Sequence, residues 1–376
     1  MRIEFLIFLR NDFNLTSILV KNILRMSVIA SDWLVFSAFS SSSIFLTGFL
    51  TRIHLKKIMS LLVWYAIVTC YTLIGFAAYP TDHVVKNSLF FFLIPLASIL
   101  NAGKFFNPSL IDILIAIIVL QILLVVALHF GGLEVFHRKG WFTKALGFYT
   151  SGGTVVNMRF YSYNFTILMC LVFMRIRMQG HRIKVVDMLL IVFAIYLSGS
   201  KGIVLAAFYP FFRLITSKSI IINGKQLIAI ISILTVTFLY FPLAKLIGAI
   251  FDPSDISNIT RLAVTASLFD GELTAWGNGF GASLPEYLIR DTTRPYGFEI
   301  SYVSYFHKLG FFFIIIMGLM LYLYGLNVLL LTLPIWTSAL GNPTLSHLMN
   351  FVLLYLAVCT ERYMRTNNIR QKHHHF

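Results

Sequence analysis

The sequence predicts an all-helical membrane protein, with residues 1–376 forming a single transmembrane domain. Of its 376 residues, 58% are hydrophobic and only 12% are charged, whereas roughly 25% of the residues of an average soluble domain are charged. Long apolar runs recur along the chain, and a helix needs about 20 apolar residues to cross the hydrocarbon core. Lipid offers no hydrogen-bond partners to a backbone, so these runs are expected to be helices. This composition excludes a soluble enzyme, a disordered chain and a fibrous protein.

Each expected helix corresponds to one apolar run. In chain order, the expected spans are residues 28–50, 59–79, 87–101, 109–130, 159–174, 185–200, 201–216, 226–248, 301–324, 326–339 and 344–360. Residues 1–27 carry four basic side chains and are either an interfacial amphipathic helix or a further, less apolar span. We favour the further span because it returns the basic N-terminus to the cytoplasm. The chain is therefore expected to cross the membrane about 11 or 12 times.

Lysine and arginine residues concentrate in four segments between or after the spans. These are Arg52/Lys56/Lys57, Arg175/Arg177/Arg182/Lys184, Lys218/Lys225 and Arg362/Arg365/Arg370/Lys372. Basic loops face the cytoplasm, and an even number of expected spans separates each cluster from the next. This placement accounts for the net charge of +15, so we expect no nucleic-acid partner.

The cysteines give no sign of a disulfide framework or a metal centre. Cys70, Cys170 and Cys359 lie far apart in apolar stretches, without the spacing of metal ligands. We expect neither a metal nor a cofactor.

Two longer polar segments are expected to face outward. The first is residues 131–158. The second, residues 249–300, is the longest polar stretch, and loops of this length are usually functional or disordered. It holds seven of the fifteen acidic residues: Asp252, Asp255, Asp270, Glu272, Glu286, Asp291 and Glu299.

The large loop contains a helical apolar pattern followed by a glycine-rich run. Arg261 opens the pattern, and Trp276–Gly281 follows it. Glycines in such a run, Gly279 among them, either form a simple turn or let a ligand approach the backbone. No strand precedes the run, so it is not a dinucleotide-binding fingerprint.

Three arginines in this loop, Arg261, Arg290 and Arg294, run against the positive-inside bias. Guanidinium groups bind phosphate and pyrophosphate bidentately. The alternative is that these arginines form salt bridges with the acids of the same loop.

Four further residues are candidates for chemistry at the outer ends of spans. Glu299 stands where the large loop re-enters the membrane, either as a general base with a raised pKa or as an exposed acid at a helix start. His307 lies further along that helix, in an expected span. Lys201, in a Ser-Gly-Ser-Lys-Gly turn, either meets an anion or snorkels to the surface. Arg159 opens the span after the first outer loop.

These segments together resemble the bacterial O-antigen polymerase and O-antigen ligase superfamily of membrane glycosyltransferases. One match is the turn Ser200-Lys201-Gly202, and another is Arg261 followed by the Gly-x-Gly segment 277–281. The third is the stretch 299–311, in which a polar residue and a short span precede an aromatic glycine turn. The matches appear in the family's order and cover roughly residues 196–315.

The resemblance implies a metal-independent glycosyltransferase of the all-helical C class. It would act on undecaprenyl-pyrophosphate-linked oligosaccharide at the outer face of the bacterial cytoplasmic (inner) membrane. Arg261 and Glu299 would be catalytic. Lys201, Arg290, Arg294, Arg159, Gly279 and His307 would bind pyrophosphate or glycan. Membrane lipid is a further expected partner, and a chain-length regulator protein is a candidate one.

Two departures from the family pattern bear on the activity. Lys201 replaces the usual arginine, keeping the charge but losing bidentate geometry. Glu299 stands where the ligases typically have a histidine, eleven residues before Gly310. The second departure favours a polymerase of O-antigen or capsule-type repeat units over a ligase that transfers glycan to the lipid A core. A flippase for lipid-linked oligosaccharides is the alternative of another class, although the chain shows no internal repeat typical of transporters.

Overall fold

The computed structural model describes a part of the chain that is mainly helical. It covers residues 55–99, 106–130, 143–151, 154–180, 183–198, 201–216, 275–283, 300–340 and 349–373, with isolated positions at 259, 262–263, 265–266 and 345. The expected spans 28–50 and 226–248, residues 1–27, and most of the loop 249–300 lie outside the described residues.

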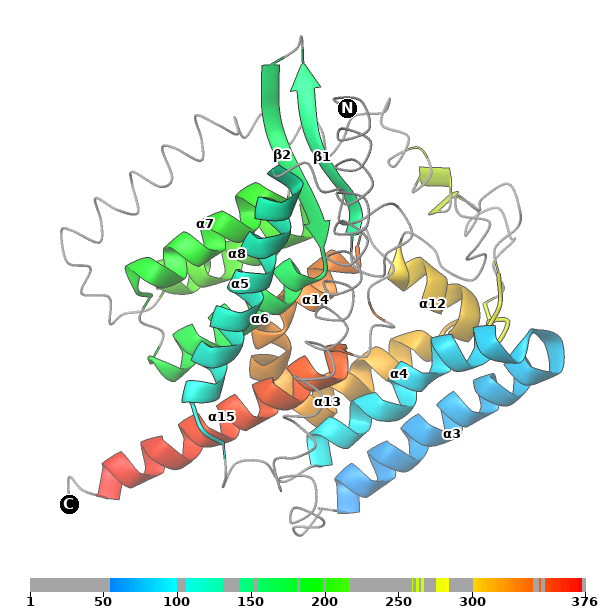
Figure 1. Ribbon diagram of the computed structural model, residues 1–376. Helices are drawn as coiled ribbons and strands as arrows, with labels where there is room; N and C mark the ends of the chain where they lie inside the picture. Colours follow the sequence, from blue (N-terminus) through cyan, green and yellow to red (C-terminus); the bar gives the residue numbers. More distant parts are fainter. Residues whose placement is uncertain are drawn as a thin grey trace, which may run out of the picture.

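The described chain is a helical bundle with one β-hairpin (Figure 1). The first part contains α3 (Leu55–Ala78), α4 (Thr81–Ile99), α5 (Ser109–Phe130), β1 (Thr143–Ser151), β2 (Thr154–Ser162), α6 (Asn164–Met178), α7 (Val185–Ser198) and α8 (Lys201–Thr216). The second part contains α12 (Ser301–Leu309), α13 (Phe312–Leu331), α14 (Leu333–Ser338) and α15 (Met349–His373).

Three helices of the described part are long and apolar enough to cross a membrane: Lys56–Ala78, Thr81–Ile99 and Phe312–Leu331. Their outer faces keep large apolar side chains exposed; on α3, Leu62 is 58% exposed and Leu73 is 63% exposed. Lipid is the solvent that suits such faces. The helical class and the membrane character are thus confirmed, whereas the full number of spans stays a prediction.

Several predicted boundaries hold and others are wrong. The apolar runs 109–130 and 201–216 coincide with α5 and α8. The run 159–174 is helical only from Asn164, because its first residues belong to β2. The run 301–324 is not one helix: α12 ends at Leu309 and α13 begins at Phe312, with Gly310 between them at φ 56°.

The expected division between the runs 301–324 and 326–339 coincides with an irregularity in the backbone of α13. Gly325, inside α13, has the non-helical angles φ 75° and ψ 160°. The chain continues as helix to Leu331 and then forms the six-residue α14. Residues 326–339 therefore do not form one uninterrupted helix.

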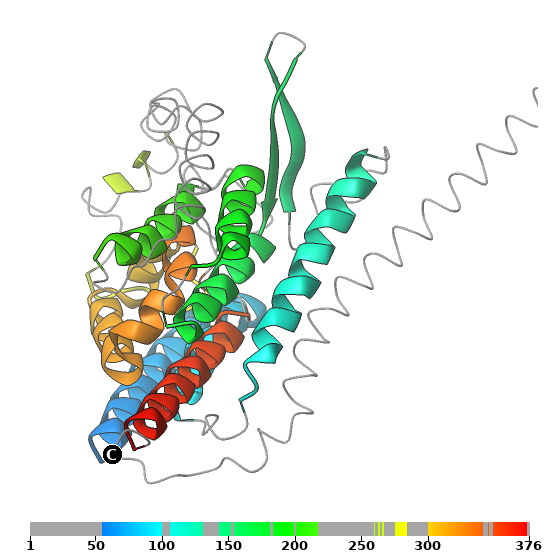
Figure 2. The same cartoon turned by 90° about the vertical axis from the view of Figure 1, so that its left-hand side faces the viewer.

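The β-hairpin corrects the expectation of an all-helical chain at residues 143–162. Its strands are antiparallel, with Leu146 opposite Phe160 and Ser151 opposite Thr154. A Gly-Gly pair separates the strands in the sequence, which is a signal for a two-residue hairpin connection. The hairpin projects beyond the helices, and β2 leads directly into α6 (Figures 1 and 2).

The core of the bundle is built around α6 and α15. Residues 165–174 of α6 and 351–361 of α15 are buried on every side, as expected of helices surrounded by protein. The pair Trp64 and Phe91 joins α3 to α4: both are buried, and the indole Nε1 donates a hydrogen bond to the Phe91 carbonyl at 2.7 Å.

Ion pairs collect at one end of the bundle, which we call the basic end. The Arg175 guanidinium lies 2.5 Å from Asp187, and that of Arg177 lies 2.5 Å from Glu361. Arg362 donates to the Ser98 carbonyl at 3.1 Å. Two basic clusters separated by an even number of expected spans therefore meet at the same end. Which side of a membrane this end faces stays a prediction.

Candidate functional site

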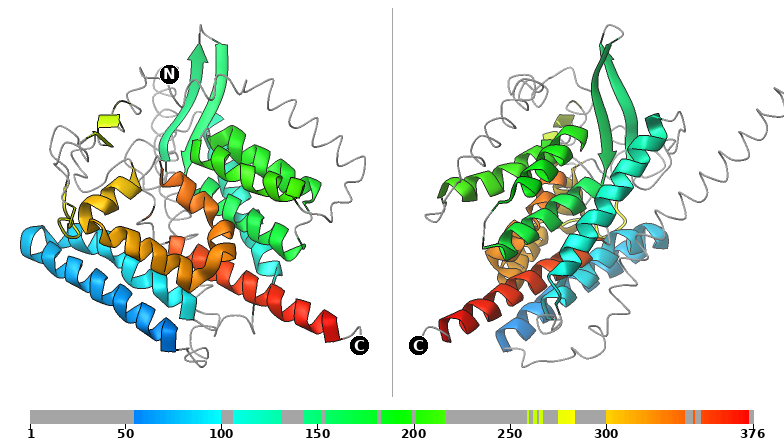
Figure 3. Two further views of the ribbon diagram at one scale, coloured as in Figure 1. Left: turned by 180° about the vertical axis from the view of Figure 1, so that it is seen from behind. Right: turned by 60° about the vertical axis from the view of Figure 1, so that its left-hand side comes forward.

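Several helices begin at the end of the bundle from which the hairpin projects, around the last residues of α14. Figure 3 (left) shows the short orange helix α14 between α12 and the green helices, below the base of the hairpin. At the start of α8, a Cβ on Gly202 would lie 2.6 Å from the Thr337 carbonyl oxygen and 2.8 Å from the Ser338 nitrogen. Only glycine permits this approach. Near the start of α6, the hydroxyls of Thr166 and Ser338 are hydrogen-bonded at 3.1 Å.

The starts of α12 and α15 join the same group. The Ser301 amide donates to the Ala339 carbonyl at 3.0 Å, and the Ser301 hydroxyl accepts from the Leu345 amide at 3.4 Å. Asn350 in turn donates through Nδ2 to the Leu345 carbonyl at 3.1 Å and accepts a hydrogen bond from the Tyr163 hydroxyl. We call this group the helix-start cluster; it comprises Tyr163, Thr166, Gly202, Ser301, Ser338 and Asn350.

The cluster is polar and buried, and its electrostatics favour anions. Ser301, Ser338 and Asn350 are each no more than 3% exposed. Helix N-termini carry a partial positive charge and unpaired backbone N–H groups. No side-chain cap hydrogen bond forms at the described N-caps of α6 and α12, Tyr163 and Ile300. Four helix starts meeting at one place therefore form a region suited to an anionic group.

Three of the predicted site residues belong to segments that reach this cluster. Lys201 is the first residue of α8. Arg159 lies in β2, opposite Gly147 and shortly before α6. Glu299 lies outside the described residues, and the next residue, Ile300, is the N-cap of α12. The backbone thus brings the first and third segments of the family resemblance to one end of α14.

The second segment of the resemblance packs against α12. Residues 275–283, which we call the glycine loop, are described. The amides of Asn278 and Gly279 donate to the carbonyls of His307 and Lys308 at 3.0 and 2.9 Å. The Phe280 amide donates to the Tyr71 carbonyl of α3 at 3.0 Å. The loop is therefore fastened between α3 and the end of α12.

Three glycines make this packing possible. Gly277 has φ 80°, and a Cβ there would lie 2.6 Å from the Lys308 oxygen and from the Gly310 nitrogen. A Cβ on Gly310 would in turn lie 2.6 Å from the Gly277 nitrogen. Gly279, a predicted ligand-binding glycine, packs on α3, where its Cβ would lie 2.8 Å from the Gly75 nitrogen. The glycines thus serve close backbone contact, which supports the turn interpretation of this run.

His307 connects the glycine loop to α12 through its ring. Its Nδ1 lies 3.1 Å from the Asn278 side-chain amide nitrogen, and its Nε2 lies 3.2 Å from the Ser283 carbonyl. A neutral ring that accepts at Nδ1 and donates from Nε2 satisfies both contacts. Burial, and to a lesser degree the charge of Lys308, lowers the pKa of His307 to about 4. At neutral pH His307 is therefore uncharged and holds the loop.

Lys308, the residue after His307, is a buried cation. It is 0% exposed, and its ammonium donates to the Ser304 hydroxyl at 2.6 Å and lies 5.2 Å from the Tyr305 ring centroid. Its helix, α12, has nine residues and is too short to cross a bilayer. Burial lowers the pKa of Lys308 to about 7.

The remaining predicted residues are not placed. Arg261, Arg290 and Arg294 lie outside the described residues, and only the backbone of Lys201 and Arg159 is described. Among the described residues, no group of three His, Cys, Asp or Glu side chains could hold a metal ion.

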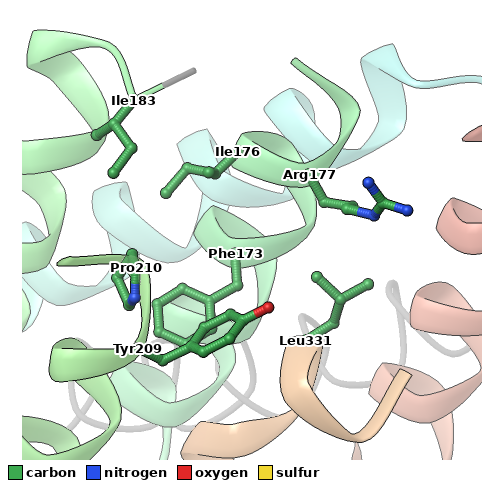
Figure 4. Close-up of a pocket in the computed structure, with 7 residues that line it drawn as sticks. All are labelled: Phe173, Ile176, Arg177, Ile183, Tyr209, Pro210 and Leu331. Carbon is green, nitrogen blue, oxygen red and sulfur yellow. The ribbon is translucent and has the colours of Figure 1, made fainter. Parts of the chain in front are cut away.

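A small pocket at the basic end is separate from the helix-start cluster (Figure 4). It is lined by Phe173, Ile176, Arg177, Ile183, Tyr209, Pro210 and Leu331. Its one charged group, Arg177, is bound to Glu361 at 2.5 and 3.2 Å. We therefore interpret this pocket as a gap beside an ion pair.

Comparison of the chain with protein-family models, with curated proteins and with solved structures gives no match.

Proposed function

We propose that this protein is a membrane glycosyltransferase that polymerises undecaprenyl-pyrophosphate-linked repeat units of an O-antigen or capsule-type polysaccharide. The observation that carries the proposal is the meeting of four helix starts around the end of α14. A pyrophosphate leaving group needs a concentrated positive potential, which helix N-termini supply. Lys201 and Arg159, in the adjoining segments, add full charges of the same sign.

In the proposed reaction, a hydroxyl of the incoming lipid-linked unit attacks the anomeric carbon of the growing glycan. A carbon–oxygen bond forms to this hydroxyl as the bond from the anomeric carbon to the pyrophosphate oxygen breaks. Glu299 accepts the hydroxyl proton. The pyrophosphate departs with the bonding electron pair and is stabilised by Lys201, Arg159 and Arg261. This electrostatic stabilisation is the larger catalytic contribution in such a site.

The glycine loop has a positioning role in this proposal. It lies between Arg261 on one side of the sequence and Arg290, Arg294 and Glu299 on the other. Its attachment to α3 through the Phe280 amide, and to α12 through Gly277 and His307, fixes the middle of the large loop on the membrane domain. His307 then acts as a positioning residue, and its neutral ring has no part in binding the anion.

The proposal is tested by replacing Lys201 in cells and comparing glycan profiles. Lys201→Ala is expected to reduce long chains at least tenfold, because a charge-assisted contact to pyrophosphate contributes about 1.5–3 kcal/mol. Lys201→Arg should retain most activity. The matched control is Lys184→Ala, which removes an exposed lysine from the basic end. Glycan lengths are measured by gel electrophoresis at equal protein level.

The same strains separate the candidate activities. A polymerase defect leaves single repeat units on the lipid carrier, whereas a ligase defect leaves long chains on it. Purified protein in detergent, given labelled lipid-linked units, should lengthen them with EDTA present if the enzyme is metal-independent. Wild-type chain lengths in Lys201→Ala, or no elongation by the purified protein, would refute the proposal.

A further inference from the structure

The helix α4 contains a proline close to its end, and a side chain of α3 compensates for it. Pro95 lies inside α4, which continues as helix to Ile99. Proline has no backbone N–H, so the Phe91 carbonyl, four residues earlier, lacks its usual donor within the helix. The indole Nε1 of Trp64 donates to this carbonyl at 2.7 Å from α3, which lies beside α4 (Figure 1). Trp64 and Phe91 are both buried, where an unpaired carbonyl would be destabilising.

Other side chains also donate to α4 carbonyls near the proline, but in a different situation. The Tyr65 hydroxyl of α3 donates to the Phe92 carbonyl at 3.1 Å, and the Tyr324 hydroxyl of α13 donates to the Ile94 carbonyl. Phe92 and Ile94 are each followed four positions later by a residue with a backbone N–H. Of these three side-chain bonds, that of Trp64 is therefore the one that replaces a missing backbone bond.

The same turn of α4 carries a ring that packs on the glycine loop and on α12. The ring centroid of Phe91 lies 4.7 Å from that of Tyr305 in α12 and 5.5 Å from that of Phe280 in the glycine loop. All three residues are buried. Buried rings in close contact do not move independently, so a displacement of α4 at Phe91 would reach both segments.

We infer that Pro95 and Trp64 together form a clamped hinge in α4. The proline removes the backbone bond that would hold the helix at Phe91, and the indole supplies a bond to the same carbonyl from another helix. While this bond is made, Phe91 holds α12 and the glycine loop in place. When it is broken, α4 can bend at Pro95 and both contacts loosen. The hinge does not depend on the proposed glycosyltransferase activity.

The experiment is a double-mutant cycle of Trp64→Phe and Pro95→Ala, in the full-length protein in detergent. Trp64→Phe leaves the Phe91 carbonyl without the indole donor and should raise the equilibrium constant for unfolding by SDS. Pro95→Ala restores a backbone N–H that can bond to the same carbonyl. In that background, Trp64→Phe should raise the constant about tenfold less, because no buried carbonyl is left unpaired. The smaller volume of phenylalanine is common to both backgrounds and cancels.

Amide hydrogen exchange of the glycine loop, followed by mass spectrometry, tests the connection to Phe280. Trp64→Phe should accelerate exchange in peptides covering residues 275–283 about tenfold, and adding Pro95→Ala should reverse this change. The matched control is Tyr65→Phe, which removes the donor to the Phe92 carbonyl. It should leave the exchange close to that of the wild type in both backgrounds.

Each outcome decides for or against the hinge. Equal effects of Trp64→Phe in the two backgrounds would overturn it, because only a loss of packing would then be measured. A change in unfolding that depends on the background, without faster exchange of the glycine loop, would overturn the connection to the loop. If Trp64→Phe does not fold, recovery of folding on adding Pro95→Ala supports the hinge, and failure of both variants to fold overturns it.

Discussion

At the scale of single residues, His307 shows how a neutral ring can fasten a loop. Its two nitrogens meet one donor, the Asn278 amide, and one acceptor, the Ser283 carbonyl. A second ring proton would point at the Asn278 amide group, which is itself a donor. Burial lowers the pKa of His307 to about 4 from 6.5, so the unfolded chain binds a proton between these values and the folded chain does not. The free energy of unfolding therefore falls as the pH is lowered through this window.

His307→Gln is expected to remove this part of the acid sensitivity. Between pH 7.5 and pH 5, the His307 contribution to wild-type stability decreases by about 2 kcal/mol, whereas a glutamine does not titrate. Thermal unfolding in detergent at both pH values measures the difference between the two proteins. His83→Gln, in the first turn of α4, is the control for replacing a histidine outside α12 and should keep the wild-type dependence. Equal acid sensitivity in His307→Gln and wild type would contradict the role assigned to His307.

The sequence identifies candidate residues better than their partners. His307 stood out as an ionisable residue in an apolar run, but its role depends on Asn278 and Ser283, more than twenty residues earlier in the chain. Lys308 has an equally buried position and was recognisable only as a lysine among the aromatic residues of 302–306. The burial of a side chain depends on how the helices pack together, and the local composition of the sequence does not reveal this packing.

At the scale of elements, the close packing of the glycine loop on α12 predicts unequal effects of two glycine substitutions. Gly277 and Gly180 both have positive φ, 80° and 68°. An alanine at Gly180 meets nothing within 4 Å, so it should cost about 1–2 kcal/mol of backbone strain. An alanine at Gly277 would also press on the backbone of residues 308–310. We expect Gly277→Ala to cost about 1–3 kcal/mol more.

Thermal unfolding and limited proteolysis distinguish these two variants. Gly277→Ala should unfold at a lower temperature than Gly180→Ala and should expose the segment around residue 280 to protease. Equal unfolding temperatures and equal cleavage would show that the loop is not fastened through Gly277.

Apolarity predicts where helices lie better than where they break. The runs that became α5 and α8 begin and end in polar segments, so their limits were visible. In the run 301–324, Gly310 is flanked by Leu309 and Phe311, and the break there depends on the approach of residues 275–277 from another part of the chain. The end of β2 was assigned to a helix because the apolar run of α6 directly follows it.

At the scale of the whole molecule, the distribution of charge predicted which segments share an end of the bundle. The segments around Arg177 and Arg362 meet at the basic end, through Glu361 and Ser98. The starts of α6, α8, α12 and α15, each expected on the other side of the membrane, meet around α14. The meeting of the helix starts could not be predicted from the sequence. Short-range patterns indicate on which side of the membrane a span ends, but they do not indicate which other span ends lie beside it.

The orientation itself gives the last prediction. Thr81, the first residue of α4, and Lys184, just before α7, are exposed and are expected on opposite sides, outside and inside. In a Cys70→Ser background, where the remaining Cys170 and Cys359 are buried, Thr81→Cys should react with a membrane-impermeant maleimide in intact spheroplasts. Lys184→Cys should react only after permeabilisation. The reverse pattern would place the helix-start cluster in the cytoplasm, where it would not meet lipid-linked repeat units at the outer face. Reaction of both positions in intact spheroplasts would contradict the expected course of the spans between them.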